Sequence, residues 1–269
     1  KVTFVMRDAV GANSVRNTLK SRSIENAVLV VGDGPLDAPV ESYDVVIIHQ
    51  QPSRSLTELL IRQALTRVGD EAAIFMCGEV KEGVRTSARY MEELCEDVEN
   101  IDGGRDGCVI IGRRPRPDAA LSEPTPRSER TAVVDGITLR WLTAPGVFSA
   151  DGLDPATELL LNTIVLPRKG KILDMGCGSG ILGMYAALRM PQCEITMVET
   201  DVASVRCSEE GIRLNGIQNA EVILSDGIEA LGRKRFDVVL TNPPVHRAGR
   251  RDARLVDRFA REAAQSIGR

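Results

Sequence analysis

The sequence has little of what metal sites, disulfide frameworks and membrane spans require. Of its 269 residues only His49 and His246 are histidines, which argues against a zinc site. The six cysteines are scattered without a C-x-x-C pair, a pattern typical of free thiols in a reducing cytoplasm. The longest apolar runs have the length of strands, and no secretory signal pattern opens the chain. These absences predict a cytoplasmic protein without a membrane segment or a bound metal.

An excess of positive charge is missing as well. The formal net charge is −4, so any affinity for nucleic acid must come from local basic patches. The hydrophobic share of 43% and the charged share of 27% are those of a soluble globular protein. A chain of this length has room for one large domain or two ordinary ones, each with a buried core.

Hydrophobic runs of strand length alternate with segments of helical composition along the chain. Strands are predicted at residues 2–6, 27–31, 44–48, 72–77, 108–111, 171–175, 194–198, 221–224 and 237–240. Helices are predicted between them, at 55–67, 86–98, 181–190, 203–214 and 255–266. This alternation predicts an α/β fold with parallel sheets covered on both faces. The stretch 113–130 is rich in proline and charge, as linkers are, and separates predicted domains at 1–112 and 131–269.

An internal repeat is the strongest sign of organisation. Adding 193 to a residue number aligns residues 2–49 with residues 195–242 without a gap. Eleven aligned pairs are identical, among them Asp8 with Asp201 and Asp33 with Asp226. The offset holds through three predicted strands and the turns between them, which an accidental likeness of composition does not explain. The two halves are therefore predicted to be copies of one α/β unit.

The two copies differ at the positions where chemistry is expected. The second copy has Asn-Pro-Pro at residues 242–244, where the first copy has His-Gln-Gln at residues 49–51. Glu199 in the second copy aligns with Met6 in the first. If these positions carry the function, the first copy has lost it.

A glycine-rich loop, in the sequence KILDMGCGSG, follows the predicted strand at 171–175. Such glycines let a ligand approach the backbone, and the next helix offers free N–H groups. Its match to the dinucleotide pattern G-x-G-x-x-G is weak evidence by itself. Asp174 precedes the loop, where a carboxylate repels a pyrophosphate but accepts hydrogen bonds from a cationic amino group. This favours S-adenosylmethionine, held by Asp174, Gly176, Cys177, Gly178 and Gly180. The alternative is a tight strand–helix turn without a ligand.

Acidic residues also end the next two predicted strands. Glu199 comes 25 residues after Asp174, at a position from which a carboxylate can bind both hydroxyls of a ribose. Asp226 and Gly227 end the following strand, where a side chain and a backbone N–H can bind adenine. The alternatives are a solvated charge at Glu199 and a turn at Asp226. Because open parallel sheets bind ligands beyond the carboxyl ends of their strands, these residues predict one cofactor site.

Asn242, Pro243 and Pro244 close the predicted strand at 237–240. The Asn242 amide oxygen and a proline-flanked carbonyl form two rigid acceptors that suit an –NH₂ group. Holding that nitrogen in line with a sulfonium methyl group frees its lone pair to attack, so positioning does most of the catalysis. A simple strand-ending turn explains the prolines but not their combination with the glycine loop. The combination favours an amino-group methyltransferase.

Three segments together resemble the ribosomal RNA guanine-N2 methyltransferases: LTAPGVFSADGLDPATELLL at 142–161, LDMGCGSGILG at 173–183 and NPPVH at 242–246. In that family a degenerate methyltransferase domain is fused to an active one, so the resemblance covers the whole chain. It implies two Rossmann-like class I methyltransferase units, of which the N-terminal one is degenerate. It also implies S-adenosylmethionine as the cofactor and guanine N2 of ribosomal RNA as the methyl acceptor.

Other site residues are implied by the resemblance. Phe148 would close over the adenosine; a core position under a loop is the alternative. His246 would hydrogen-bond the target base, or else cap the helix that follows. Asp154 and Pro155 suit the first positions of a helix, as N-cap and first helical residue.

The chain departs from the family pattern in two places. Val245 stands where the family usually has an aromatic residue that stacks on the target base, a contact typically worth about 1–3 kcal/mol. The chain also ends at Arg269, shortly after the fourth strand of the second copy, so its C-terminal sheet is expected to be incomplete and the domain truncated.

Arginines cluster directly after the Asn-Pro-Pro motif. They are Arg247, Arg250, Arg251, Arg254, Arg258 and Arg261. Phosphate contacts require such a patch, so RNA is the predicted partner, bound through the region of the first four. A solvated helix face is the alternative. Two other functions stay open: methyl transfer to protein glutamine or DNA adenine amines, and a non-catalytic RNA-binding or assembly module.

Overall fold

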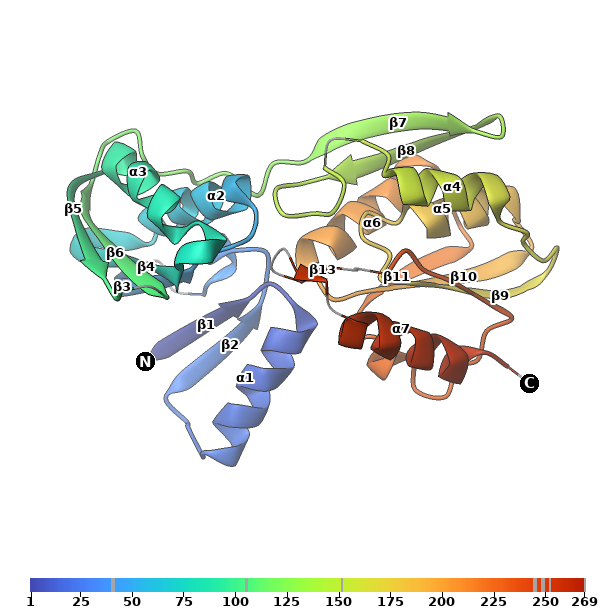
Figure 1. The fold of residues 1–269 in the computed structure, drawn as a ribbon, viewed down its shortest axis with the longest axis horizontal. Helices are drawn as coiled ribbons and strands as arrows, with labels where there is room; N and C mark the ends of the chain where they lie inside the picture. Colours follow the sequence, from blue (N-terminus) through green and yellow to red (C-terminus); the bar gives the residue numbers. More distant parts are fainter. Residues whose placement is uncertain are drawn as a thin grey trace. The chain divides into compact units, whose positions relative to one another are not determined.

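The chain forms two compact units in the computed structural model (Figure 1). The structure describes residues 1–39, 42–104, 106–150, 152–243, 246–247, 250–251 and 253–268, with the backbone alone at Asp70, Asp102, His246, Arg247, Arg250 and Arg251. One unit comprises Lys1–Met6 and Asn26–Pro126, and the other comprises Arg7–Glu25 and Arg127–Arg269. The segment 7–25 of the first repeat thus belongs to the unit that contains the second repeat.

The first unit contains a four-stranded sheet in the order β3-β4-β6-β5. These strands are β3 (Tyr43–His49), β4 (Val68–Glu79), β5 (Cys95–Asp102) and β6 (Gly107–Pro115); β3 and β4 are parallel, and the other pairs are antiparallel. A separate parallel pair consists of β1 (Val2–Met6) and β2 (Ala27–Val31). The helices are α2 (Arg54–Leu65), α3 (Val84–Leu94) and the short η1 (Pro35–Asp37) and η2 (Val80–Glu82). Ile61 and Met91 from α2 and α3 are buried against Ile74 and Ile110 of the sheet.

The helix predicted over 86–98 is wrong in its last four residues. α3 ends at Leu94, and the acidic stretch CEDVENID forms strand β5 instead. Its composition suits a helix, but antiparallel pairing with β6 prevails. Ion pairs of Arg113 with Glu99, at 3.4 Å, and of Arg114 with Asp97 join the two strands. Tertiary pairing therefore decides the conformation here.

The segment predicted as a linker is held to the first unit over much of its length. β6 continues to Pro115, and the next strand begins at Ser128. Between them, Leu121 N donates to the Arg62 carbonyl at 3.0 Å, and Arg62 donates to the Ala119 carbonyl at 3.3 Å. Ala119 is also buried. The proline-rich composition therefore marks an irregular segment, but one that packs on α2.

The second unit is built on a parallel sheet in the order β11-β10-β9-β12. Its strands are β9 (Gly170–Met175), β10 (Cys193–Glu199), β11 (Ala220–Leu224) and β12 (Val238–Leu240). Its helices are α1 (Ala9–Ser21), α4 (Pro155–Thr163), α5 (Ile181–Arg189), α6 (Val202–Leu214), α7 (Ala253–Ser266) and the short η3 (Glu229–Leu231). β7 (Ser128–Val134) and β8 (Ile137–Thr143) form a hairpin, and β13 (His246–Arg247) pairs with β14 (Arg250–Arg251). The α/β class predicted from the sequence is confirmed.

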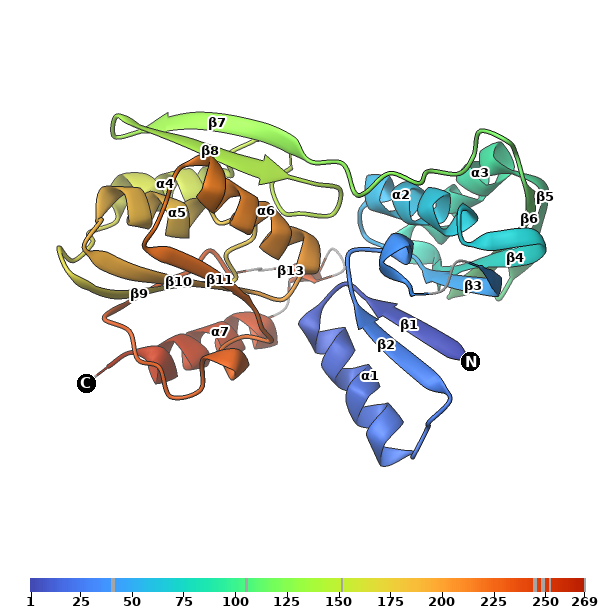
Figure 2. The same ribbon diagram turned by 180° about the vertical axis from the view of Figure 1, so that it is seen from behind.

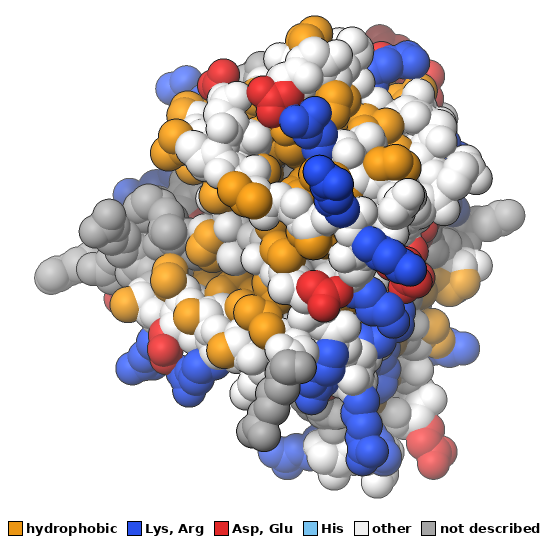
Figure 3. All heavy atoms as spheres, turned by 90° about the vertical axis from the view of Figure 1, so that its right-hand side faces the viewer, with side chains coloured by type: hydrophobic (Ala, Val, Ile, Leu, Met, Phe, Trp, Pro, Cys, Tyr) orange, Lys and Arg blue, Asp and Glu red, His pale blue; other side chains and the backbone are white. Residues whose placement is uncertain are grey.

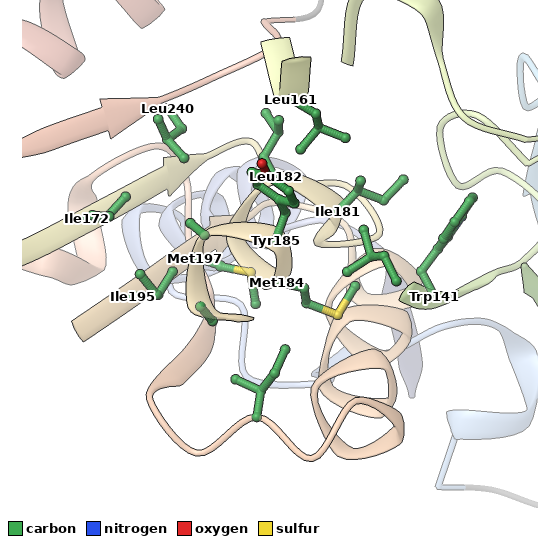
Figure 4. Close-up of a cluster of buried hydrophobic side chains, with 14 of the residues drawn as sticks. Trp141, Leu161, Ile172, Ile181, Leu182, Met184, Tyr185, Ile195, Met197 and Leu240 are labelled. Atoms are coloured by element: carbon green, nitrogen blue, oxygen red, sulfur yellow. The ribbon is translucent and has the colours of Figure 1, made fainter. Parts of the chain in front are cut away.

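Helices cover both faces of this parallel sheet. Figures 1 and 2 show α5 and α6 on one face and α7 on the other. Side chains along β9 alternate between the faces, as the two-residue period of a strand requires. Ile172 packs with the α5 residues Leu182 and Tyr185 in the core shown in Figure 4, whereas Leu173 packs with Phe259 of α7. Strands buried on both faces explain why this sheet has continuous apolar runs.

The repeat predicted from the sequence is visible in the secondary structure. With the offset of 193, α1 coincides with α6 and β2 coincides with β11 at both ends. The strand registers also agree, since Val2 pairs with Ala27 and Ile195 pairs with Ala220. The two segments therefore fold as copies of one unit.

Segments 7–9 and 200–202 of the two repeats meet within the second unit. Ala9 N donates to the Thr200 carbonyl and Val202 N donates to the Arg7 carbonyl, both at 2.8 Å. With the offset of 193, Ala9 aligns with Val202 and Arg7 aligns with Thr200. Exchanging the two repeats therefore converts one hydrogen bond into the other. The contact thus has a local two-fold relation, with Asp8 and Asp201 forming an antiparallel bridge.

Candidate active site

Four predicted site residues lie at or just beyond the carboxyl ends of the parallel strands: Asp174, Glu199, Asp226 and Asn242. In the sheet register, Asp174 is paired with Met197 of β10 and with Leu240 of β12. Glu199 lies two residues beyond Met197, and Asn242 lies two residues beyond Leu240. The structure therefore places these side chains along one edge of the sheet.

The glycine loop leaves β9 in a conformation that side chains disfavour. Gly176, Gly178 and Gly180 have φ angles of +71°, +57° and +81°, in the left-handed region. The N–H of Gly176 donates to the Val198 carbonyl at 2.9 Å, which ties the loop to β10. A Cβ atom on Gly178 would meet open space, so its glycine is required by the backbone conformation. The loop is thus fixed and leaves room beside Gly178.

Asp174 is a buried carboxyl group with only part of its hydrogen-bonding capacity used. The residue is 0% exposed, and its Oδ2 accepts the Gly183 N–H at 2.8 Å. Within the described part of the chain its Oδ1 has no hydrogen-bond partner. Burial raises the pKa of Asp174 to about 7; the nearby Glu199 charge adds to this, and the Gly183 hydrogen bond opposes it. A hydrogen-bond donor that reached Oδ1 would remove the energetic cost of leaving this buried acceptor without a partner.

Glu199 connects the glycine loop to the start of α6. Its Oε2 accepts the Gly178 N–H at 2.8 Å. Its Oε1 accepts the backbone N–H groups of Thr200 at 2.7 Å and Asp201 at 3.2 Å, and the Thr200 hydroxyl at 3.1 Å. The carboxylate is therefore held by backbone donors, and Oε2 keeps the capacity to accept a further hydrogen bond.

Asp226 and Gly227 contact helix α7, which the sequence did not indicate. Arg258 Nη2 donates to Asp226 Oδ1, and Arg258 Nε donates to Glu262 Oε1, each at 2.5 Å. Gly227 has φ +58°, and a Cβ atom there would overlap the Glu262 carboxylate. The adenine-binding positions predicted from the sequence thus lie directly against α7.

Phe148 and Cys177 differ in exposure. Phe148 is 62% exposed, so it is not a core residue, and the alternative of a buried packing role is wrong. The thiol of Cys177 has its pKa raised well above the ordinary value, mainly by burial and then by the charges of Asp174 and Glu199. The raised pKa favours the protonated thiol at neutral pH, which argues against a nucleophilic role for Cys177.

Asn242 is joined to residues far away in the sequence. Its amide Nδ2 donates to Asp154 Oδ2 at 2.9 Å and to Thr157 Oγ1 at 3.0 Å. Asp154 is the N-cap of α4, as predicted, and its Oδ2 also accepts the Thr157 N–H at 2.9 Å. The sequence suggested the helix start but not this contact. The amide oxygen of Asn242 has no partner among the described residues.

The remaining residues of the motif are only partly described. Pro243 follows Asn242 as a partly buried residue. Pro244 and Val245 lie outside the described residues, and so does the side chain of His246. Their predicted roles therefore stay predictions.

The first copy closes the corresponding position with its own side chains. Gln50, which aligns with Pro243, is buried. Its Oε1 accepts from Ser87 at 2.6 Å, and its Nε2 donates to the Gln51 carbonyl at 2.9 Å and to Thr57 Oγ1 at 3.3 Å. This amide is thus used internally, and the structure gives the first copy no open acceptor at Gln50.

Ion pairs engage Arg258 and Arg261 of the predicted basic patch. Arg258 contacts Asp226 and Glu262, and Arg261 pairs with Asp257 one turn away. Arg254 is exposed, whereas the side chains of the other three lie outside the description. Figure 3 shows Lys and Arg side chains in a line down one face of the molecule, with few acidic side chains among them. Positive charge is therefore gathered locally despite the net charge of −4.

The described residues include neither a metal-binding cluster nor a membrane-spanning helix. Within those ranges, no group of three or more His, Cys, Asp or Glu side chains could hold a metal ion. None of the described helices combines the length and apolar character needed to cross a membrane.

Two family models match the chain, one in each part of the sequence. The methyltransferase small domain matches residues 138–268, and the methyltransferase small domain N-terminal model matches residues 1–121. The boundary between the two matches falls in residues 122–137, close to the division between the structural units at Pro126.

Similar proteins carry one recurring description. The ribosomal RNA small subunit methyltransferase C of Pasteurella multocida is 32% identical over 77% of this chain and 61% of its own length. The protein of the same description from Pseudoalteromonas atlantica is 29% identical over 82% of this chain and 64% of its own length. The chain thus spans about three fifths of these curated relatives.

One solved structure resembles nearly the whole chain. A 16S rRNA N2 methyltransferase from T. thermophilus, solved in complex with AdoMet and guanosine, aligns with a TM-score of 0.82 and 25% identity. The alignment covers 99% of this chain and 71% of that one. The architecture of both units is therefore that of the class I methyltransferase fold.

Proposed function

The chain belongs to the methyltransferase small domain family, and on this premise we propose that it transfers a methyl group from S-adenosylmethionine to guanine N2 of ribosomal RNA. The observation that carries the proposal is the position of Asn242 beside the glycine loop. β12 pairs with β9, so the acceptor group and the loop leave neighbouring strands at the same level. Such an arrangement brings a target amine next to a cofactor held by the loop.

The residues at the loop fit the methionine end of S-adenosylmethionine. Asp174 Oδ1 is a buried acceptor without a partner in the described part of the chain, and a cationic amino group supplies the missing donor. Gly178 leaves room where any other residue would place a side chain. Glu199 would accept hydrogen bonds from the ribose hydroxyls, for which Oε2 has capacity. Asp226 and Gly227 would contact the adenine. When bound, the cofactor supplies an electrophilic methyl group on a sulfonium.

The chain's own residues would orient the nitrogen that accepts the methyl group. The Asn242 amide oxygen and the Pro243 carbonyl accept the two hydrogens of the target –NH₂. With both hydrogens held, the nitrogen lone pair turns out of conjugation with the ring. Positioning and a polar environment then lower the barrier, and the methylated nitrogen would afterwards release its extra proton to water, so no strong base is required.

RNA would contact the second unit next to this site. The T. thermophilus protein was solved with guanosine, which supports a guanine base as the acceptor. We infer that Arg247, Arg250, Arg251 and Arg254 contact phosphates, because they follow the Asn-Pro-Pro motif directly. The first unit keeps the fold without the acceptor and would serve as a support or an RNA-binding surface. With a ribosomal RNA substrate, we expect the enzyme to act in the cytoplasm.

Two measurements test the proposal together. Calorimetry should show that the chain binds S-adenosylmethionine, and no binding would contradict an enzymatic role. Methyl-transfer assays should then compare unmodified small-subunit ribosomal RNA, a release factor with its glutamine acceptor, and DNA. We expect transfer to the RNA alone; transfer to the protein or to DNA would assign the same site to a different amine.

A further inference from the structure

We propose that Asp154 and Thr157 are positioning residues that fix the orientation of the Asn242 amide. They would make the amide oxygen, and not the nitrogen, face the target amine. The inference rests on the proposed function, and it concerns two residues that act through Asn242 without touching the substrate.

The hydrogen-bond polarity of this network follows from the Asp154 carboxylate. An ionised carboxylate only accepts hydrogen bonds. Asp154 Oδ2 accepts from the Thr157 N–H at 2.9 Å and from the Thr157 hydroxyl at 3.3 Å. The Asn242 group at 2.9 Å from the same oxygen must therefore be the –NH₂ group. The Thr157 hydroxyl donates its hydrogen to Asp154. Its oxygen therefore accepts the second N–H of Asn242, at 3.0 Å.

Both hydrogens of the Asn242 amide are consequently used, and its oxygen is the group left over. A flipped amide would bring its oxygen against the carboxylate and would present two N–H donors to the target amine. The N–H donors of the flipped amide would then face the N–H donors of the target amine. The contact with Asp154 and Thr157 thus selects the only orientation in which Asn242 can hold an –NH₂ group.

The two positioning residues are themselves fixed by helix α4. Asp154 is its N-cap, Pro155 is its first residue, and Thr157 is 6% exposed. Leu161, two positions before the helix ends, is buried in the core shared with α5. The network therefore joins the Asn-Pro-Pro motif to a packed helix 88 residues earlier in the chain.

Two substitutions at position 154 separate positioning from helix capping. In Asp154→Ser the hydroxyl still caps the helix, since Ser is a good N-cap. The Ser side chain is shorter than that of Asp, so the hydrogen bond with the Asn242 amide is lost. In Asp154→Asn the side-chain oxygen can keep both contacts. We expect kcat to fall at least about tenfold in Asp154→Ser, with an unchanged Kd for S-adenosylmethionine and an unchanged Tm. Asp154→Asn should retain most of the activity. Equal kcat values for the two variants would overturn the inference.

A second substitution tests the other half of the network. Thr157→Val keeps the shape of the side chain but removes the acceptor for one Asn242 hydrogen. It should lower kcat without changing cofactor affinity, and Thr157→Ser should restore activity. A Thr157→Val protein with the kcat of the parent would contradict the role assigned to the hydroxyl.

A measurement without turnover separates this inference from the proposed function. In ¹⁵N-labelled protein, the side-chain NH₂ resonances of Asn242 are identified by their loss in Asn242→Asp. Slow solvent exchange of both hydrogens, accelerated in Asp154→Ser, is the expected result. Fast exchange in the parent would overturn the inference even in an active enzyme. Slow exchange in a protein that methylates no amine would instead refute the proposed function and leave the network standing.

Discussion

At the scale of single residues, Asp174 combines burial with an unused acceptor. Its raised pKa of about 7 means that the folded chain disfavours the charged form. The ordinary pKa is 3.8, so the folded state binds more protons than the unfolded state between these two values. Folding stability should therefore fall as the pH rises from about 4 to 7, and the penalty should persist above that range.

Replacement of Asp174 by Asn isolates this effect. At pH 3, below both pKa values, the parent and Asp174→Asn should have similar free energies of unfolding, because the acid is neutral in the folded and in the unfolded chain. At pH 8 the variant should be more stable by more than about 1 kcal/mol, since one pKa unit corresponds to about 1.4 kcal/mol. Urea unfolding of both cofactor-free proteins at the two pH values measures this. A difference that does not change with pH would refute the assignment.

Gly183 is a second residue whose identity the site requires. It lies inside α5, and a Cβ atom there would come within 2.2 Å of Met197 Sδ and 3.1 Å of Asp174 Oδ2. Gly183→Ala should lower the free energy of unfolding by about 1–2 kcal/mol, because overpacking exceeds the gain in helix propensity. It should also weaken cofactor binding by moving Asp174.

Gly211→Ala is the matched control, in helix α6. There the nearest atom to an added Cβ is Met184 Sδ at 2.8 Å, followed by the end of that side chain. It should cost less stability than Gly183→Ala and should leave cofactor binding unchanged. A smaller loss in Gly183→Ala would contradict the packing argument, and calorimetry with urea unfolding decides.

Much of the site was predictable at the residue scale, and one part was not. Asp174, Glu199 and Asn242 follow strands in the sequence, and a parallel sheet necessarily brings strand ends to one edge. Asp154 was recognisable only as a helix start. Its contact with Asn242 depends on how α4 packs, which no local pattern in the sequence encodes. The Arg258 contact with Asp226 was unpredictable for the same reason.

At the scale of elements, the two repeats meet where the cofactor site is expected. Thr200 and Asp201 donate backbone N–H groups to Glu199, and the same two residues contact Ala9 and Arg7 of the first repeat. The segment before α1 thus supports the loop that holds Glu199. This is a structural use for a copy that has lost its own acceptor.

Substitution of Arg7 tests this support. Arg7 pairs with Asp201 at 3.3 Å, with the Arg7 side chain only 11% exposed. Arg7→Gln should raise the Kd for S-adenosylmethionine about two- to tenfold, since a hydrogen bond of this kind contributes on the order of 1 kcal/mol. Arg16→Gln, on the exposed surface of α1, should leave the Kd unchanged. Identical affinities for the two variants, measured by calorimetry, would remove the supporting role.

Elements were predictable where a local pattern agreed with the tertiary environment. The buried parallel strands gave continuous apolar runs, and the offset of 193 aligned helices and strands correctly. Strand β5 was missed because its acidic sequence resembles a helix, and only pairing with β6 makes it a strand. The β7–β8 hairpin was missed too, although Asp135 and Gly136, with φ of +49° and +74°, form a turn that an Asp-Gly pair indicates.

At the scale of the whole molecule, two copies of one fold have diverged in chemistry. In the first copy the amide of Gln50, which aligns with Pro243, is hydrogen-bonded internally, whereas in the second copy the oxygen of Asn242 has no partner among the described residues. The family match in both parts of the chain agrees with this division. We therefore infer that methyl transfer belongs to the second unit alone.

The most direct test is the nucleoside product formed by the parent and by Asn242→Ala. Both proteins would be incubated with isotope-labelled S-adenosylmethionine and unmodified small-subunit ribosomal RNA, and the digested nucleosides analysed by mass spectrometry. We expect labelled N2-methylguanosine from the parent, and none from Asn242→Ala despite unchanged cofactor binding. Label on another atom or base, or undiminished N2-methylguanosine from the variant, would contradict it.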